Sequence, residues 1–153
     1  MIGIEGNKRK LPNQPAWAFI DAQFTWDDKA NLSGKVAHSK NAFGVVEIFG
    51  EAPAACELLD GVFLAAKKSS LDKANVRFDE QFDFHFYDLD FCRTARQEGL
   101  TLGTWIIKLT HQSAGAFGTP QWREKHQKYI NKWEDPMTQN MQATENIDAR
   151  HIN

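Results

Sequence analysis

The stretch of residues 77–111 most constrains how this chain can fold, because it joins a strand pattern, a helix pattern and a second strand pattern. Over residues 82–87 aromatic side chains alternate with polar ones, which is the period of a half-buried strand. A helix is predicted next, with Asp88 as its N-cap and Gly99 as its terminator. The apolar run at 102–109 predicts another strand. The stretch therefore predicts a strand–helix–strand unit of an α/β protein.

Acidic residues at the start of this predicted helix form a candidate site. Asp88 and Asp90 lie at a strand-to-helix junction, where sites of open α/β sheets commonly form. An Asp is also a favoured N-cap, and a second Asp in the first turn complements the helix dipole, so both could serve the fold alone. His111 follows the next predicted strand, and it is either a loop anchor or a member of the same pocket. Two carboxylates and an imidazole suit a divalent cation, or a general base beside a stabilising group.

Composition restricts the class of protein. A chain of 153 residues with 42% hydrophobic residues is expected to form one domain with a substantial core. The net charge of −2 gives no general attraction to nucleic acid or to a membrane surface. Cys56 and Cys92 form neither a disulfide framework nor a zinc-binding spacing. No apolar run approaches the length of a membrane span, and no signal-peptide pattern is present. We therefore expect a cytoplasmic protein without a transmembrane segment or a nucleic-acid partner.

The other elements are predicted from apolar runs and helix start signals. They are a short strand at 1–4, a loop-rich region from Gly6 to residue 40, strands at 44–50 and 58–66, a helical turn at 70–75, and a helix at 121–133. Thr119 and Pro120 are the cap and first residue of that last helix, and its buried side is expected to contain Trp122, Tyr129 and Trp133. The expected fold is α/β, with a mixed sheet flanked by few helices. Residues 1–135 would form a single domain and 136–153 a polar tail.

Two details of these segments bear on function. Asp60 and Gly61 interrupt the apolar run at 58–66, where a buried acid needs a polar partner and a glycine indicates close backbone approach. Aromatic residues in the loop-rich region either fix the loop to the core or line a cleft, and the first alternative is favoured; they are Trp17, Phe19, Phe24 and Trp26.

The order of several motifs resembles a known family. The motifs are L-D-G-V-F-L-A at 59–65 with a basic pair after it, F-D-E at 78–80, H-F-Y-D-L-D-F at 85–91, then Gly99 and His111. Together they resemble the C-terminal half of a GT-A-fold glycosyltransferase of the inverting family 2 type, closest to the bacterial subgroup of surface-polysaccharide synthesis. The opening residues 2–9, with Trp17 downstream, also resemble that subgroup. The similarity extends to about residue 133.

This resemblance implies roles for individual residues. Asp88 matches the general base that deprotonates the acceptor hydroxyl, and Tyr87 stands where the family motif usually has Glu. Asp60 and Gly61 match the strand under the sugar site. His111 matches a histidine that helps to hold the metal on the donor diphosphate. The substrate-binding set that we expect is completed by His85, Asp90 and Trp122.

The resemblance also implies what another chain would have to supply. The family begins with a nucleotide-binding half that ends in a metal-binding Asp-x-Asp motif, and Asp88-Leu-Asp90 does not match it in context. We therefore expect hexosyl transfer from a nucleotide sugar to a glycan or lipid-linked acceptor, with a nucleotide-binding partner chain, and only weak binding of Mn²⁺ or Mg²⁺ by this chain alone. We also expect a homo-oligomer whose contact uses the N-terminal strand or the aromatic loop. The alternatives are a non-catalytic carbohydrate-binding or interaction module, and a metal-dependent hydrolase that uses Asp88, Asp90 and His111.

Overall fold

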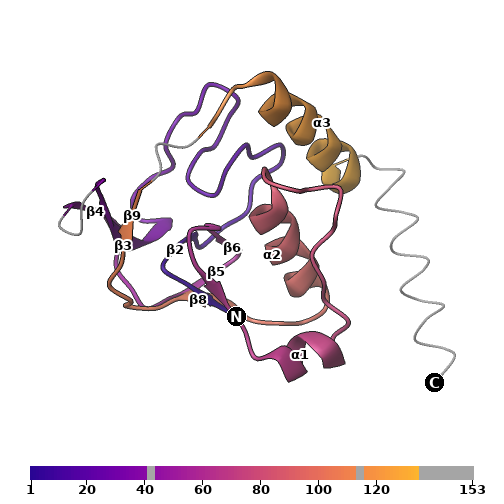
Figure 1. Ribbon diagram of the computed structural model, residues 1–153, viewed down its shortest axis with the longest axis horizontal. Coiled ribbons are helices and arrows are strands. Elements are labelled where there is room, and N and C mark those ends of the chain that lie inside the picture. The colour runs from indigo at the N-terminus through magenta and orange to yellow at the C-terminus, as the bar shows by residue number, and fades with distance from the viewer. Residues whose placement is uncertain (41–43, 113–115, 135–153) are drawn as a thin grey trace, which may run out of the picture.

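The computed structural model describes residues 1–40, 44–112 and 116–134, and in these residues it contains two β-sheets and three α-helices (Figure 1). The first sheet has the strand order β5-β8-β1-β7, with bounds Ala54–Cys56, Leu102–Thr104, Ile2–Gly3 and Leu64–Ala65. The second has the order β4-β3-β2-β6, with bounds Val45–Gly50, Leu32–His38, Glu5–Asn7 and Leu58–Leu59, and β9 (Thr110–His111) also pairs with β3. The helices are α1 (Lys68–Lys73), α2 (Tyr87–Gln97) and α3 (Pro120–Glu134). The expected α/β class is confirmed.

The N-terminal segment connects the two sheets. Strands β1 and β2 are separated only by Ile4, which is 1% exposed, so one short run of chain enters both sheets. β1 pairs in parallel with β8 and antiparallel with β7. β3 also pairs in parallel with β9, and the remaining pairs are antiparallel, so both sheets are mixed. The strands form two sheets, however, and not the single mixed sheet expected from the sequence. Because β1 has a partner on both sides, it has no free edge for the intermolecular contact expected of it.

Helix α2 lies at the centre of the molecule and packs on β6 (Figure 1). The thiol of Cys92 accepts a hydrogen bond from Leu59 N at 3.2 Å, and Cys92 and Ala95 are fully buried. The predicted end is confirmed: Gly99 has φ 78°, and the amides of Gly99 and Leu100 donate to the carbonyls of Arg96 and Ala95. This is the hydrogen-bond pattern that closes helices at a left-handed glycine.

The predicted start of α2 is wrong in two respects. Residues 82–86 contain no strand; Phe82 and Phe86 are buried but Phe84 is 62% exposed. Phe86, with φ 65°, is the N-cap, and it provides no side-chain cap. Asp88 is therefore in the first helical turn and is not the cap. Its carboxylate is available for other contacts.

Helix α3 begins as predicted. The hydroxyl of Thr119 accepts a hydrogen bond from Trp122 N at 3.1 Å, and Pro120 is the first helical residue. Its buried side chains are Trp122, Tyr129 and Trp133, as expected. Arg93 of α2 joins this face, donating to Tyr129 Oη at 3.1 Å and Glu134 at 2.7 Å. These contacts fix α3 against α2.

Other boundaries differ from those that the sequence predicts. The run at 58–66 is divided into β6 and β7 by a turn at Gly61 and Val62. The run at 102–109 is a strand only to Thr104, after which Trp105 and Ile106 are more than half exposed. The region predicted as loop from Gly6 to residue 40 contains the last two residues of β2 and all of β3. Helix α1 begins two residues before the predicted turn. The predicted tail at 136–153 lies outside the described residues, and in the described part no helix could cross a membrane.

Candidate functional site

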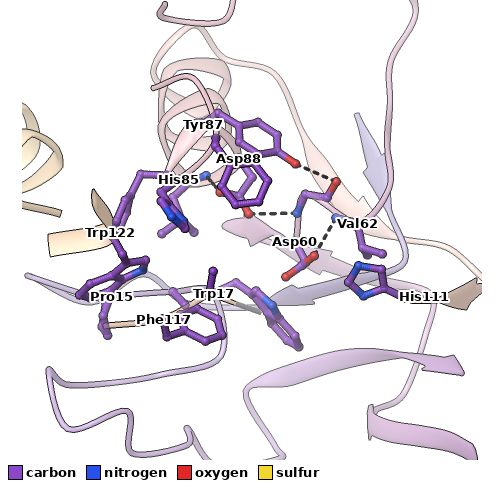
Figure 2. Close-up of a pocket in the computed structure, with 16 residues that line it drawn as sticks. Pro15, Trp17, Asp60, Val62, His85, Tyr87, Asp88, His111, Phe117 and Trp122 are labelled. Atoms are coloured by element: carbon purple, nitrogen blue, oxygen red, sulfur yellow. Dashed lines mark hydrogen bonds between the residues drawn. The ribbon is translucent and has the colours of Figure 1, made fainter. Parts of the chain in front are cut away.

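Seven of the eight predicted site residues line one cavity of about 360 Å³, which we call the Asp88 pocket. The pocket is formed by the start of α2, the turn between β6 and β7, the loop around Trp17 and the start of α3. Figure 2 shows Tyr87 and Asp88 on one side, and Trp17 and Phe117 on the other. The predicted residues that line it are Asp60, Gly61, His85, Tyr87, Asp88, His111 and Trp122.

Hydrogen bonds hold the β6–β7 turn against the first turn of α2 (Figure 2). Gly61 N donates to Asp88 Oδ2 at 3.0 Å, and the Tyr87 hydroxyl donates to the Gly61 carbonyl at 3.0 Å. Asp60 Oδ1 accepts from Val62 N at 2.7 Å, which is the partner that a buried acid requires. A Cβ at position 61 would meet the Tyr87 hydroxyl and would lie 3.2 Å from Asp88 Cβ. The turn therefore needs glycine because the helix approaches its backbone closely.

Asp60 and Asp88 form an electrostatically coupled pair of carboxyl groups. Burial, and then the charge of Asp60, raise the pKa of Asp88 to about 7, against the opposing effect of the hydrogen bonds from Leu89 N and Gly61 N. Burial also raises the pKa of Asp60, while hydrogen bonds from Val62 and Trp17 oppose it. When two carboxyls repel each other in a poorly solvated site, one keeps its proton to higher pH. At neutral pH Asp88 is consequently poised between acid and base.

Aromatic side chains enclose the carboxyl pair. Trp17 and Trp122 are almost fully buried, whereas Phe84 and Phe117 are about half exposed and stand at the opening. Burial lowers the pKa of His85, which also lines the pocket, so this imidazole favours its neutral form. A cavity with flat apolar walls and a few converging polar groups is the usual form of a small-molecule site.

Asp90 is not among the residues of the Asp88 pocket. It is 1% exposed and faces α3, where it accepts a hydrogen bond from Trp133 Nε1 at 2.8 Å and lies 2.7 Å from Lys132 Nζ. Residues two positions apart on a helix lie on different faces, so Asp88 and Asp90 cannot both enter one pocket. These contacts fix α2 against α3, and the structure does not bring Asp90 together with the other predicted site residues.

His111 lies on β9 at the edge of the pocket, beside His38, with 5.6 Å between their ring centroids. Among the described residues no group of three His, Cys, Asp or Glu side chains is arranged to hold a metal ion. The hydrolase alternative also loses its third member, because Asp90 points elsewhere.

Three polar residues near this site were not anticipated from the sequence. Glu5, His38 and Glu47 lie on β2, β3 and β4 and line a second cavity of about 520 Å³, the Glu5 pocket. They were missed because the sequence does not give the pairing of β2, β3 and β4 that brings them together, and His38 lies in a region predicted as loop. The one available signal was an acid directly after the apolar residues 1–4.

Comparison with known proteins adds no relative: no protein-family model matches the chain, and neither a curated protein nor a solved structure is significantly similar to it.

Proposed function

We propose that the chain is a glycosyltransferase-like module in which Asp88 removes the proton from the acceptor hydroxyl during hexosyl transfer. The observation that carries the proposal is a carboxyl group of pKa about 7 in an aromatic-walled pocket. A general base is most effective when its pKa lies near the working pH. The resemblance of the motifs around Asp60, Asp88 and His111 to family 2 glycosyltransferases supports the same role.

The chemistry divides among the residues of the pocket. Asp88 would accept the hydroxyl proton, and the neighbouring charge of Asp60 would make that proton acceptance more favourable. The Gly61 amide holds the Asp88 carboxylate through Oδ2, which leaves lone pairs on both oxygens for the substrate. Trp17 and Trp122 would pack on the apolar face of a sugar ring. The attacking oxygen then bonds to the anomeric carbon as the nucleoside diphosphate leaves.

The nucleotide sugar would be held by a partner chain. We include this partner because the resemblance is confined to the acceptor half of the family. The proposed acceptor is a glycan or a lipid-linked sugar.

The test is a transfer assay with the full chain, a nucleotide-binding partner supplied in trans, and labelled nucleotide hexoses. Asp88→Asn should lower the transfer rate by about 100- to 10,000-fold, the usual contribution of a positioned base. Asp90→Asn is the matched control two residues along the same helix, and it should keep a rate close to that of the native chain. Full activity in Asp88→Asn would contradict the assignment. If glycans bind to the native chain but no partner restores transfer, a non-catalytic carbohydrate-binding module is the better description.

A further inference from the structure

The Glu5 pocket is adjacent to the Asp88 pocket but contains different chemistry. The two cavities share Trp17, Asp60, His111 and Phe117, together with Ala16. Glu5 and Glu47 belong only to the Glu5 pocket, as does Trp26. The larger cavity therefore extends from the shared wall to the second sheet.

Glu5 is an unusual residue to find in this position. It is 3% exposed, and its Oε1 accepts no hydrogen bond from the described residues. Burial, followed by the charges of Asp60 and Glu47, raises its pKa to about 8. A buried acceptor without a partner costs free energy, and such exceptions call for an explanation. A ligand that donates a hydrogen bond in the cavity would provide that partner.

Aromatic faces form much of the remaining wall. Trp26 stacks on Phe49 with 5.7 Å between ring centroids, and Phe19 meets Trp26 edge-on at 5.0 Å. Trp26 is 50% exposed, so its indole is accessible from solvent. None of the described residues that line this cavity is Lys or Arg. The pocket thus combines acidic groups with π faces, and His38 and His111 are the only described basic side chains that line it.

We propose that the Glu5 pocket binds the ammonium group of a small organic amine, with Glu5 as its counter-charge and Trp17 and Trp26 as its aromatic walls. A primary ammonium has three N–H donors for carboxylate oxygens, and it is attracted to the faces of aromatic rings. This inference does not rest on glycosyl transfer, because Glu5, Glu47 and Trp26 line the Glu5 pocket alone, although Trp17 and Asp60 line both cavities.

Binding should release a proton from Glu5 to the solvent below its pKa, because the ammonium ion pairs with the carboxylate form. The other titratable groups around it are Asp60 and Glu47, which attract a cation, and His38 and His111, which repel it when protonated. Because the pKa of Glu5 is raised to about 8, binding should strengthen as the pH rises toward that value. From pH 7 to pH 8 the ionised fraction of Glu5 alone grows by roughly fivefold, and the affinity should rise with it.

The experiment titrates the full chain with n-butylammonium and with n-butanol, and follows the indole N–H signals of Trp17 and Trp26 by NMR. We expect n-butylammonium to bind at pH 8 with a dissociation constant of about 1 mM or below, and n-butanol to bind far more weakly. Calorimetry in two buffers of different ionisation enthalpy should detect the released proton. Equal binding of the alcohol, or no binding of the amine, would overturn the proposal.

Variants distinguish binding in the Glu5 pocket from nonspecific electrostatic attraction of the amine to the protein. Glu5→Gln retains the shape but loses the charge, and it should weaken n-butylammonium binding by at least about 30-fold. Trp26→Leu, at a half-exposed position, should weaken it by roughly two- to 30-fold. The matched control is Glu98→Gln on the exposed end of α2, which should bind as the native chain does. Native affinity in Glu5→Gln would refute the role of Glu5.

Discussion

Replacement of Asp88 by Asn should make the protein more stable at pH 8, because the native carboxylate is held where its charge is unfavourable. The pKa of Asp88 is about 7 in the folded chain and about 4 when the chain is unfolded. A raised pKa contributes stability that is complete below the unfolded value and is lost as the pH rises through the folded one. The loss from pH 4 to pH 8 is about 4 kcal/mol. Asn removes this loss and retains an oxygen to accept from Gly61 N.

The assay is urea unfolding of the native chain and Asp88→Asn at pH values between 4 and 8. The difference in unfolding free energy should be small at pH 4 and should favour the variant by about 2 to 4 kcal/mol at pH 8. The titration of Glu5 is common to both proteins and cancels in the difference. Asp79→Asn is a contrasting control: it loses an ion pair with Lys132 at 2.7 Å and should be destabilised. A pH-independent difference, or a variant that is less stable at pH 8, would refute the reasoning.

Three further predictions concern other parts of the molecule. Burial raises the pKa of Asp27, but hydrogen bonds from Arg9, Asn7 and other donors outweigh it and hold the pKa below its usual range. Asp27→Ala should therefore lower the free energy of unfolding, measured by chemical denaturation at neutral pH, by about 3 kcal/mol. This loss should become smaller as the pH falls below about 4. Strand β4 lies at the edge of its sheet, and its residues Val46 and Ile48 are more than half exposed. Sedimentation should therefore detect self-association of the native chain that Ile48→Lys abolishes, and a monomeric native chain would contradict this expectation. Calorimetry should show that Mn²⁺ binds more weakly than about 1 mM, whereas tight binding lost in His111→Ala would restore the metal-dependent alternatives.

Elements with strong local signals were predictable from the sequence. The proline and threonine at the start of α3 and the glycine after α2 act through backbone geometry within a few residues, so they can be read directly. Trp122, Tyr129 and Trp133 follow from helical spacing. The resemblance assigned Asp60 and Asp88 to one substrate site, but their direct proximity was not predicted, since 27 residues separate Gly61 from Asp88 along the chain.

The remaining features depend on tertiary contacts that local patterns do not encode. The aromatic alternation at 82–86 imitates a strand, but Phe82 and Phe86 are buried in the core without any strand pairing. Asp88 was predicted as the N-cap because Asp is a common residue at that position. In the structure the N-cap is Phe86, which has a left-handed backbone conformation. Strands β2 and β3 are short or contain Gly34, and long-range pairing stabilises them. The Glu5 pocket could not be foreseen without that pairing.

The most direct measurement of the proposed role of Asp88 is the pH titration of its carboxyl carbon by ¹³C NMR in the native chain and in Asp60→Asn. We expect a midpoint near pH 7 in the native chain, because of burial and the charge of Asp60, and a lower midpoint in Asp60→Asn. A native midpoint near 4, unchanged by Asp60→Asn, would contradict the assignment of Asp88 as a base tuned to neutral pH.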